Sequence, residues 1–509
     1  MDNFGVRYFA QRDRDFVAVI DAMGARRSRG ALQDVVNRTA RALTAAGLEP
    51  GDSIAIVAPN CAEYLAITLA GLTAGLYVVP VNWHLAVAET AFVLADSGAK
   101  ALFAHASLGK LRLAALVEHS ARAAVRVTIG GSAPDFERLE NFIAAQAADS
   151  WSERVSGRVM AYTSATTGRP KGVRLPLQGS DRALRKIVSW HRSLGIEIEG
   201  SNVHLCASML YHSAPLEGAL TALHMGHRVI LLDGWDPETL LRKIEEHAVT
   251  TTFMVPAMFV RLLKLPRAVR ARYSTKSLRF VVHGGAPCPI EVKHRMLEWW
   301  GPIIWEAYGA AEAQGTIVSP VDWLARPGTV GKAIAGSQLK IVGNAGVELP
   351  PREIGLVYLT RHTGDRFEYY GNVEQTRLAY RGEFVTAGDV GYLDEEGFLY
   401  ICDRQHDVII TSGMNIYPAE IEQVLVQHPD VADCAVVGMP NELFGEVPRA
   451  VVLPMPNAVA GPHLTADLLR FLAERLAPMK LPRHVEYAAH IPRDPNGKLQ
   501  RRLLRRSAA

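Results

Sequence analysis

The chain has 509 residues, of which 49% are hydrophobic and 21% are charged, an ordinary globular composition. A single hydrophobic core stops growing at about 250–300 residues, so a chain of this length is expected to form more than one domain. The 55 basic and 52 acidic residues nearly balance, which argues against nucleic acid or an anionic membrane as a partner.

The cysteines and the first residues indicate the compartment. The five cysteines are scattered and show no Cys-x-x-Cys spacing, which favours reduced thiols over a disulfide framework or a zinc site. Met1–Phe4 begins no basic segment that leads into an apolar core, so no signal peptide is predicted. We therefore expect a cytoplasmic protein that is a monomer or a homodimer.

The first predicted elements surround an apolar run from Tyr64 to Val81. A strand over Ser53–Val57 is followed by a helical pattern over Cys61–Ala74 and a second strand over Leu76–Pro80. Glycines and a proline interrupt the run. A buried helix followed by a strand therefore explains it better than a membrane span, and no transmembrane segment is predicted.

The segment Tyr162–Val173 is rich in hydroxyl groups and ends close to a lysine. It reads Tyr-Thr-Ser-Ala-Thr-Thr-Gly-Arg-Pro-Lys-Gly-Val and follows a short strand predicted over Arg158–Tyr162. Hydroxyls, free backbone N–H groups and an ammonium on one turn form a site for phosphate oxygens. The segment is no Walker A loop, because the Gly-Lys-Ser/Thr step is missing. A polar surface turn is the alternative.

Strand-then-helix pairs continue along the chain. Arg228–Leu232 precedes a helical pattern over Pro237–His247, and Phe280–His283 precedes one over Ile290–Trp300. This order predicts a mostly parallel α/β sheet that binds ligands at the carboxyl ends of its strands.

The pattern changes in the last third of the chain. From Gly328 to Tyr400, short strands broken by glycines predict a small β-barrel or sheet. From Arg404 onward a small α+β unit is predicted, with its own strands and helices over Cys434–Gly438, Arg449–Leu453, Pro418–Gln427 and Thr465–Ala477. The basic cluster Arg501–Arg506 is interpreted as a solvated end.

Seven short motifs follow one another along the chain. They are Tyr162–Val173, Tyr211-His212, Tyr308-Gly-Ala-Ala-Glu312, Gly388-Asp389, Asp403-Arg404, Ser412–Pro418 and Pro495-Asn-Gly-Lys498. Together they resemble the AMP-forming acyl-CoA synthetase group of the ANL superfamily of adenylate-forming enzymes. The resemblance implies a large N-terminal domain over residues 1–402, made of mostly parallel α/β sheets and a small β-barrel. A small mobile α+β domain over residues 403–509 would rotate about a hinge near Asp403.

The implied reaction has two steps. A carboxylate attacks the α-phosphate of ATP to give an acyl-adenylate, and the thiolate of coenzyme A then displaces AMP. Charge builds on phosphate in the first step, so the site needs cations and oriented donors. The resemblance implies ATP or AMP, Mg²⁺ and coenzyme A as cofactors, and a carboxylic acid or its adenylate as the substrate.

The resemblance also assigns roles to residues. Lys498 matches the adenylation lysine, and Glu312 the acidic residue near Mg²⁺, an ion that prefers hard oxygens. Asp389 would accept from the ribose hydroxyls, although a turn-capping role for it is about as well founded, and Arg404 would reach the ribose or the phosphate. Tyr308 would stack on adenine or border the acyl pocket. A solvated tail lysine is the alternative for Lys498.

Three further groups complete the predicted site. His212 would lie between the carboxylate site and the pantetheine channel, although a lone loop histidine is more often structural. Ser412 and Gly413 would border the thiol tunnel, and Gly284, Gly285 and Ala286 would lie under adenine and the acyl group. The remaining implied nucleotide-binding positions are Thr163, Ser164, Ala165, Thr166, Thr167, Gly168, Lys171, Gly309, Ala310 and Ala311.

Three departures from the family pattern affect the ATP phosphates. Ala165 replaces a glycine, Ala311 replaces a hydroxyl residue, and Pro176-Leu177 replaces a hydroxyl-histidine pair. Losing one charge-assisted hydrogen bond costs about 1.5–3 kcal/mol, or roughly ten- to a hundredfold in rate. We therefore expect thioester formation to be intact and adenylation to be weakened or absent, in which case a partner adenylating enzyme would supply acyl-adenylate. An ordinary acyl-CoA ligase that tolerates the alanines remains the second hypothesis.

Two other classes stay open. A stand-alone adenylation protein that loads a carrier-protein phosphopantetheine would share nearly every motif, although no long insertion of the kind that blocks coenzyme A is evident. A non-catalytic binding pseudoenzyme is less favoured, because Lys498 and Glu312 are retained. The predicted acyl pocket includes Tyr211, Trp235 and Met258 and carries few charges, which favours an apolar acid. Asp233 and Asp236 leave an amino-acid substrate open.

Overall fold

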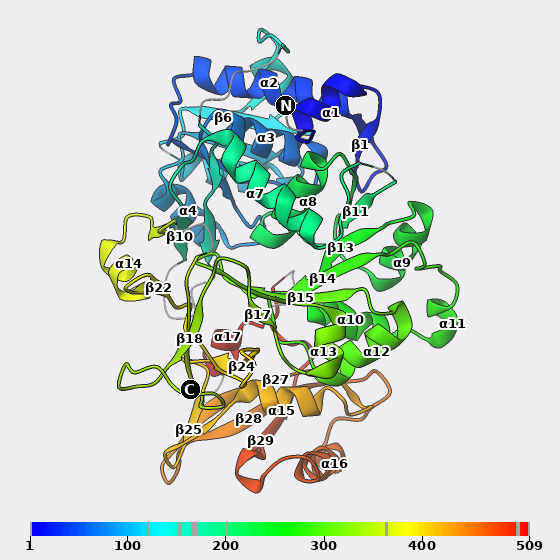
Figure 1. Ribbon diagram of the computed structural model, residues 1–509, viewed down its shortest axis with the longest axis vertical. Helices are drawn as coiled ribbons and strands as arrows, with labels where there is room; N and C mark the ends of the chain where they lie inside the picture. Colours follow the sequence, from blue (N-terminus) through cyan, green and yellow to red (C-terminus); the bar gives the residue numbers. More distant parts are fainter. Residues whose placement is uncertain are drawn as a thin grey trace. The chain divides into compact units, whose positions relative to one another are not determined.

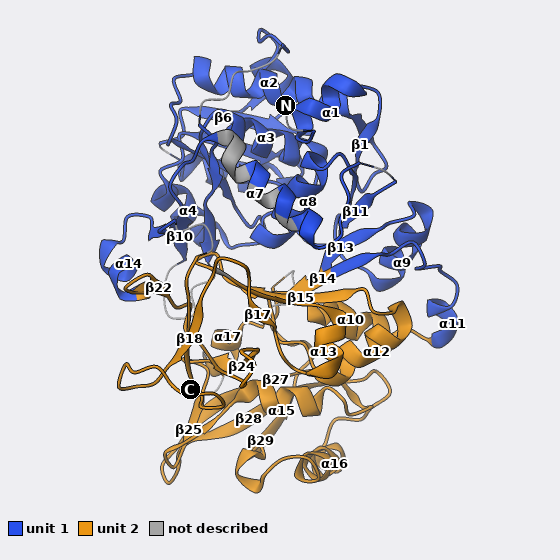
Figure 2. Ribbon diagram, in the orientation of Figure 1, with its two compact units in different colours: residues 1–253, 267–281, 365–378 blue, residues 254–266, 282–364, 379–509 orange. Residues whose placement is uncertain are grey.

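The computed structural model of the protein describes residues 3–120, 122–149, 155–163, 170–199, 201–361, 365–494 and 499–506. These residues form two compact units (Figure 2), each built from separate stretches of the chain. Unit 1 contains residues 1–253, 267–281 and 365–378, and unit 2 contains residues 254–266, 282–364 and 379–509. The domain boundary expected at residues 402 and 403 stays a prediction.

Unit 1 contains a six-stranded parallel sheet in the order β7-β6-β5-β3-β4-β8. Its strands are β3 (Ser53–Val57), β4 (Tyr77–Pro80), β5 (Ala101–His105), β6 (Val125–Ile129), β7 (Glu137–Arg138) and β8 (Arg158–Val159). Parallel strands buried on both faces need continuous apolar sequences, and β3, β4 and most of β5 are fully buried.

Helix α3 (Ala62–Thr73) accounts for most of the apolar run, and it packs against α2 (Arg29–Ala45) in the core of unit 1 (Figure 1). Gly71 allows its close approach to the sheet, since a Cβ there would lie 2.7 Å from Val78 Cγ2 and 2.8 Å from Ile54 Cδ1. The helix is therefore buried, as the sequence predicts. Among the described residues, no helix is long and apolar enough to cross a membrane.

A second group of strands in unit 1 is ordered β13-β11-β12-β1-β2, with only β2 antiparallel to its neighbour. The strands are β1 (Val17–Ile20), β2 (Arg26–Ser28), β11 (Val203–Cys206), β12 (Arg228–Leu231) and β13 (Thr251–Met254). The other helices of unit 1 are α1 (Val6–Arg12), α4 (Val87–Ser97), η1 (Ala106–Leu108), α5 (Lys110–Glu118), α6 (Leu139–Phe142), α7 (Ser180–Ser193), α8 (Ser213–His224), α9 (Pro237–Glu246), α11 (Arg267–Arg270) and α14 (Val373–Ala379). The predicted strand-then-helix order is present.

The strand predicted over Arg158–Tyr162 is in fact two strands. Residues Arg158–Val159 pair with β4, whereas β9 (Ala161–Thr163) joins an antiparallel sheet with β10 (Lys171–Arg174) and β20 (Glu368–Tyr369). Met160 lies at the change and donates its N–H to Val78 O at 2.8 Å. The chain therefore leaves one sheet for another within a continuous β-type sequence.

Unit 2 contains most of β14 (Phe280–Gly284), together with β15 (Ile304–Gly309), β16 (Gln314–Val318) and β17 (Lys332–Ala333). Helices α10 (Pro256–Lys264), α12 (Ile290–Trp300) and α13 (Pro320–Ala325) belong to the same unit. The glycine-broken region forms a six-stranded antiparallel sheet of β18 (Leu339–Val342), β19 (Gly355–Leu359), β21 (Tyr380–Arg381), β22 (Phe384–Val385), β23 (Asp389–Leu393) and β24 (Leu399–Arg404).

The last part of unit 2 is the expected small α+β region. A five-stranded sheet contains β25 (Ile409–Thr411), β26 (Met414–Ile416), β27 (Val431–Asn441), β28 (Gly445–Pro454) and β29 (His484–Tyr487). Its helices are α15 (Pro418–Leu425), α16 (Pro462–Ala473), η2 (Pro478–Lys480) and α17 (Arg501–Arg506). The two predicted strands lie within the longer hairpin strands β27 and β28, whose apolar side chains pack against α15 and α16.

Candidate active site

In unit 1, the loop after β11 carries Tyr211 and His212, and a buried asparagine holds this loop in place. Asn60 Nδ2 donates to Ser208 O at 2.9 Å and to Leu232 O at 2.8 Å, while Asn60 Oδ1 accepts from Leu210 N at 2.8 Å. Asn60 follows β3, so one side chain joins the segments that leave β3, β11 and β12. These are carboxyl ends of parallel strands, where α/β folds bind ligands.

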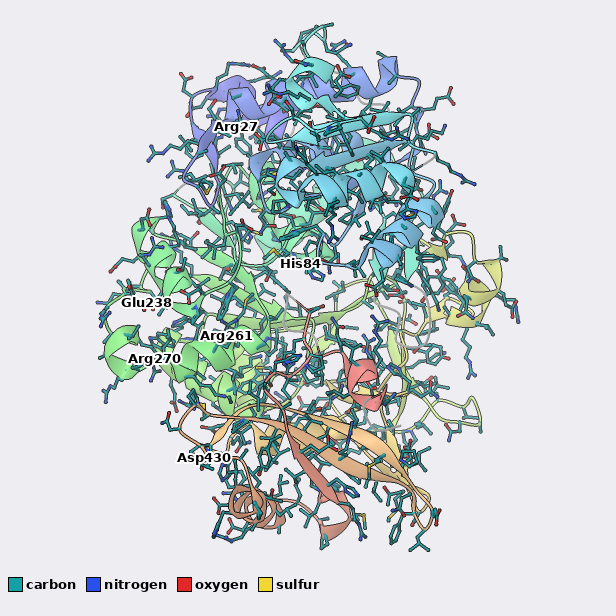
Figure 3. All side chains as sticks on the ribbon, turned by 180° about the vertical axis from the view of Figure 1, so that it is seen from behind. Arg27, His84, Glu238, Arg261, Arg270 and Asp430 are labelled. Atoms are coloured by element: carbon teal, nitrogen blue, oxygen red, sulfur yellow. The ribbon has the colours of Figure 1, made fainter. Side chains whose placement is uncertain are left out.

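Tyr211 and His212 belong to an aromatic cluster with two residues that follow β4. The Tyr211 hydroxyl lies 3.2 Å from His84 Nδ1, and the ring centres of Tyr211 and His212 are 4.5 Å apart. Trp83 stacks on His84 with ring centres 3.7 Å apart, and His84 is labelled in Figure 3. Partial burial, with Arg112 adding to it, lowers the pKa of His84, which favours the neutral ring.

Sequence analysis missed Asn60, Trp83 and His84. Their signal was position, because each follows a strand of the predicted parallel sheet within a few residues. Trp235 follows β12 in the same way, two residues after Asp233.

The predicted phosphate loop is described only at its two ends. Thr163 closes β9, and Lys171 opens β10 with its Nζ 2.8 Å from Gln375 Oε1 and 4.7 Å from the ring centre of Tyr369. Ser164, Ala165, Thr166, Thr167 and Gly168 lie outside the described residues.

In unit 2, three predicted residues come together on β15, β23 and β24. Tyr308 donates its hydroxyl to Asp389 Oδ2 at 2.8 Å, and Arg404 Nε lies 3.3 Å from Asp389 Oδ1. Burial, and after it the Asp389 carboxylate, raise the pKa of Tyr308 well above its usual value, so the phenol stays protonated. The group presents a carboxylate flanked by a phenol and a guanidinium.

The predicted motif Tyr308–Glu312 continues into a tight turn. Ala310 and Ala313 exchange two backbone hydrogen bonds of 2.8 and 3.2 Å, so Ala311 and Glu312 form the tip between β15 and β16. Gly309 precedes this turn. Gly315 is needed opposite Tyr308, because a Cβ there would lie 2.6 Å from Tyr308 O.

Arg361, which sequence analysis missed, binds this turn. Its Nη1 donates to Glu312 O at 2.7 Å and to Ala311 O at 3.4 Å. The side chain of Glu312 is buried. Among the described residues, no group of three or more His, Cys, Asp or Glu side chains is arranged to hold a metal. A single hard carboxylate suits Mg²⁺, which is usually held by one or two carboxylates and substrate phosphates. The predicted Mg²⁺ therefore stays a prediction.

Gly284 ends β14, and Gly285 and Ala286 follow it directly. Gly285 has a φ of +81°, a left-handed conformation that favours glycine. Met258 is buried on α10.

A buried charged group lies beside these residues in unit 2. Lys293 Nζ is 2.6 Å from Glu306 Oε2, which is 3.4 Å from His283 Nε2, and the side chains of Lys293 and His283 are fully buried. Burial raises the pKa of Glu306 and lowers that of Lys293, and each partner opposes the shift of the other. Burial, with Lys293 adding to it, keeps the pKa of His283 well below its usual value, so His283 is neutral.

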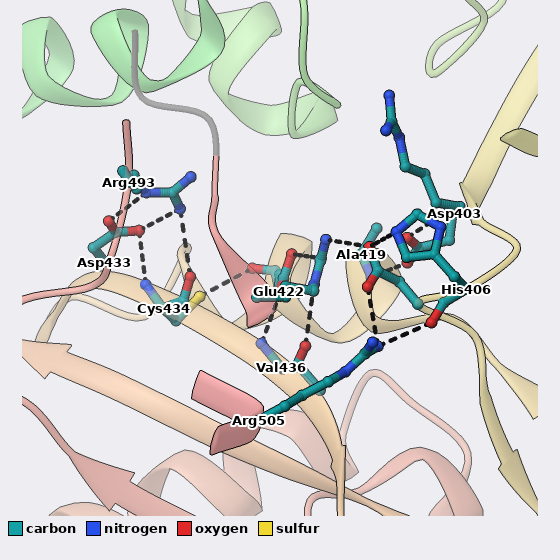
Figure 4. A network of polar contacts seen from close by, with 12 residues as sticks. Asp403, His406, Ala419, Glu422, Asp433, Cys434, Val436, Arg493 and Arg505 are labelled. Atoms are coloured by element: carbon teal, nitrogen blue, oxygen red, sulfur yellow. Dashed lines mark hydrogen bonds and ion pairs between the residues drawn. The ribbon is translucent and has the colours of Figure 1, made fainter. Parts of the chain in front are cut away.

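Asp403, the predicted hinge residue, joins β24 to α15. Its carboxylate accepts from Arg404 N at 2.8 Å and from Ala419 N at 2.9 Å (Figure 4). Burial raises the pKa of Asp403, and Arg501 opposes that shift.

The expectation of a solvated basic end is wrong. Arg501 Nη2 lies 2.7 Å from Glu422 Oε2, and Arg505 Nη2 lies 3.0 Å from Asp407 Oδ1 (Figure 4). Helix α17 is thereby fixed to the region after the predicted hinge. Lys498 precedes this helix and lies outside the described residues.

Ser412 and Gly413 form the two-residue turn between β25 and β26. Their φ angles are +50° and +79°, as a type I′ hairpin turn requires. Ser412 is one of the few residues other than glycine in this conformation among those described.

Comparison with known proteins decides the family. The profile described as "AMP-binding enzyme" matches residues 6–363, and "AMP-binding enzyme C-terminal domain" matches residues 420–498. The chain belongs to the AMP-binding enzyme family. Its resemblance to the ANL superfamily, the α/β fold with a smaller C-terminal part, and an adenylate-forming ligase activity are confirmed.

Relatives of this AMP-binding enzyme differ in the acceptor they use. This chain is 32% identical to a fatty acid–acyl-carrier-protein ligase, ScoC, of Streptomyces coeruleorubidus, over 92% of this chain and 89% of the relative. It is 34% identical to a feruloyl-CoA synthase of Amycolatopsis over 92% of each chain. The o-succinylbenzoate-CoA synthetase of Bacillus subtilis, solved with an acyl-adenylate intermediate, matches with a TM-score of 0.81 at 28% identity, over 98% of this chain and 97% of that one.

Proposed function

We propose that this AMP-binding enzyme forms an acyl-CoA thioester from a carboxylic acid through an acyl-adenylate. In the first step the carboxylate oxygen bonds to the α-phosphorus of ATP and pyrophosphate leaves. In the second step the thiolate of coenzyme A bonds to the acyl carbon and AMP leaves. Family membership and the group formed by Tyr308, Asp389 and Arg404 support this proposal, and the group is the observation that carries it.

Asp389 suits a ribose, because its carboxylate can accept hydrogen bonds from two neighbouring hydroxyls. The Tyr308 hydroxyl and Arg404 hold that carboxylate in place. Gly284, Gly285 and Ala286 would let adenine and the acyl group approach the backbone. We assign Lys498 to the cation that bridges carboxylate and α-phosphate, and Glu312 to a Mg²⁺ that would neutralise phosphate charge when bound.

Two further groups are assigned to the second step. His212, held in the cluster with Tyr211 and His84, would border the acyl carbon, and the small turn Ser412-Gly413 would leave room for pantetheine. Trp235 and Met258 would line an apolar acyl pocket. Asp403 would be the hinge residue.

We further propose that adenylation is the weaker half-reaction. Ala311 forms the tip of the turn where a hydroxyl would donate to the α-phosphate, and Ala165 adds a β-carbon in the phosphate loop. Neither change touches the turn Ser412-Gly413. Slow adenylation would let a partner enzyme supply acyl-adenylate.

The test separates the two half-reactions. Pyrophosphate exchange is measured with a panel of apolar carboxylic acids for the unaltered protein and for Ala165→Gly and Ala311→Thr, and coenzyme A capture of supplied acyl-adenylates is measured in parallel. We expect ready capture by all proteins and exchange raised about ten- to a hundredfold by Ala311→Thr. Brisk exchange by the unaltered protein would discard the weakened half-reaction. Absence of capture would reject the thioester-forming function and leave a binding pseudoenzyme.

A carrier-protein thiol is the second candidate acceptor. It is favoured by the ScoC relative, whose name gives an acyl carrier protein as the acceptor. Replacing coenzyme A by a phosphopantetheinyl carrier protein in the capture assay distinguishes the two. Acylation of the carrier without turnover of coenzyme A would favour that candidate.

A further inference from the structure

A positively charged side chain from outside the motif Tyr308–Glu312 binds the turn between β15 and β16. Arg361 follows β19, and its guanidinium donates to the carbonyl oxygens of Ala311 and Glu312, the two residues at the tip. The nearer contact, 2.7 Å from Nη1 to Glu312 O, has the length of a strong charge-assisted hydrogen bond.

The position of Arg361 is fixed by the backbone next to it. Thr360 donates its N–H to Gln338 O at 2.9 Å, and the Thr360 hydroxyl accepts from Gln338 N at 2.7 Å. Arg361 itself is half-buried. An arginine held on such an anchored strand end loses little freedom when it binds, and its charge is only partly screened by water.

The turn also offers a main-chain donor. Ala310 and Ala313 use their N–H groups on each other, whereas the Ala311 N–H has no acceptor among the described residues. Because the guanidinium holds the carbonyls of Ala311 and Glu312, the N–H groups at the tip are held in a fixed direction. A fixed backbone N–H next to a cation is the chemistry that binds a phosphate oxygen.

We propose that Arg361 and the Ala311 N–H form a phosphate subsite that takes over part of the task of the hydroxyl missing at Ala311. The inference rests on the proposed function, and its ligand is the α-phosphate of the nucleotide or the acyl-adenylate. Arg361 is a positioning residue: it orients the turn and adds positive charge where the adenylation step builds negative charge on phosphorus. Thioester formation from a ready-made acyl-adenylate also uses this subsite, because the phosphate of the departing AMP gains a negative charge when the bond from acyl carbon to phosphate oxygen breaks.

The test compares Arg361→Gln, Arg361→Lys and Ala311→Thr, singly and combined, with Arg352→Gln as a matched control. Arg352 lies in the same unit and is bonded to Glu395 at 2.8 Å, but its side chain is exposed. AMP binding is measured by calorimetry, which needs no turnover. Pyrophosphate exchange and coenzyme A capture of a supplied acyl-adenylate are measured on the same preparations, together with the melting temperature.

We expect Arg361→Gln to weaken AMP binding and to slow both exchange and capture, each by about ten- to a hundredfold, with an unchanged melting temperature. Arg361→Lys should recover part of the AMP affinity, and adding Ala311→Thr to Arg361→Gln should recover about tenfold. Arg352→Gln should change nothing.

Two results would overturn the inference. The first is that Arg361→Gln binds AMP within about threefold of the affinity of the unaltered protein. The second is that AMP binding, exchange and capture fall equally together with the melting temperature, and that neither Arg361→Lys nor the addition of Ala311→Thr restores them. Failure of the proposed function looks different: an unaltered protein that binds AMP but never captures coenzyme A would reject thioester formation, while the AMP affinities would still decide on Arg361.

Discussion

The two units hold their candidate site residues by different means. In unit 1, neutral groups hold the site residues: Asn60 binds three main-chain groups, and His84 Nδ1 lies 3.2 Å from the Tyr211 hydroxyl. In unit 2, charged groups do it: Asp389 lies between Tyr308 and Arg404, and Lys293 is bonded to Glu306 in the core.

The two units are therefore sensitive to different substitutions. Removing a neutral side chain loses a few hydrogen bonds, whereas removing one member of a buried ion pair leaves an uncompensated charge. Unit 2 is therefore expected to tolerate single substitutions less well. Both units are expected to respond to acid, because His204, His224 and His227 in unit 1 and His283 in unit 2 have pKa values lowered by burial.

The largest expected effect is in the core of unit 2. Lys293→Met leaves Glu306 buried without its partner and should lower the free energy of unfolding by about 3–5 kcal/mol. Chemical denaturation measures this loss. The double variant Lys293→Met/Glu306→Leu removes both charges and should recover most of it. A single variant that costs less than about 1 kcal/mol would remove the distinction between the units.

The next effect concerns Asn60 in unit 1. Asn60→Ala should lower the free energy of unfolding by about 2–3 kcal/mol, since two carbonyls and one N–H lose their partner. Capture of supplied acyl-adenylate should also slow, because the loop of Tyr211 and His212 is released. The exposed Asn141→Ala is the control and should change stability by less than about 0.5 kcal/mol. Equal effects of the two substitutions would contradict a positioning role for Asn60.

Acid should weaken unit 1. Burial lowers the pKa of His204 to about 3 and those of His224 and His227 to about 4, below the unfolded value of about 6.5. Between the folded and the unfolded pKa, each of these histidines is protonated in the unfolded chain but not in the folded protein. The stability that each neutral histidine contributes is therefore fully present above about pH 6.5 and is lost as the pH falls below that value.

The effect of a single histidine can be isolated. From pH 7 to pH 5 one such group accounts for about 2 kcal/mol, so His204→Gln should reduce the acid-induced loss by about that amount. Denaturation at the two pH values measures it, and the exposed His463→Gln is the control. A pH dependence that His204→Gln leaves unchanged would argue against a neutral buried histidine.

The smallest effect is at the turn between β25 and β26. Ser412 adopts a φ of +50°, so Ser412→Gly should raise the free energy of unfolding by about 0.5–1 kcal/mol. Ser412→Ala keeps the β-carbon and should show no such gain. A destabilised glycine variant would mean that the serine hydroxyl contributes more than the backbone strain costs.

Local patterns were enough to predict most elements. The helix Ile290–Trp300 was predicted with its observed bounds, since a proline precedes it and a glycine follows it. The motif Tyr308–Glu312 likewise identified Tyr308, which donates to Asp389.

Contacts between distant residues could not be predicted in this way. Asn60 bonds residues about 150 positions later, and Arg361 bonds a turn about 50 positions earlier, so no local spacing indicates either role. The change of sheet at Met160 depends on which strands lie beside it, since its sequence is β-type on both sides. The basic end is bonded to carboxylates because the fold brings Glu422 and Asp407 to Arg501 and Arg505.

The central claim is that this enzyme completes a thioester from an acyl-adenylate more readily than it makes the adenylate. One measurement tests it directly: the rate of acyl-CoA formation from purified acyl-adenylate compared with that from the same acid and ATP, with coenzyme A saturating. If adenylation is the weaker half-reaction, the acyl-adenylate should react at least about tenfold faster. Equal rates would contradict weakened adenylation, and no thioester from the acyl-adenylate would contradict the proposed function itself.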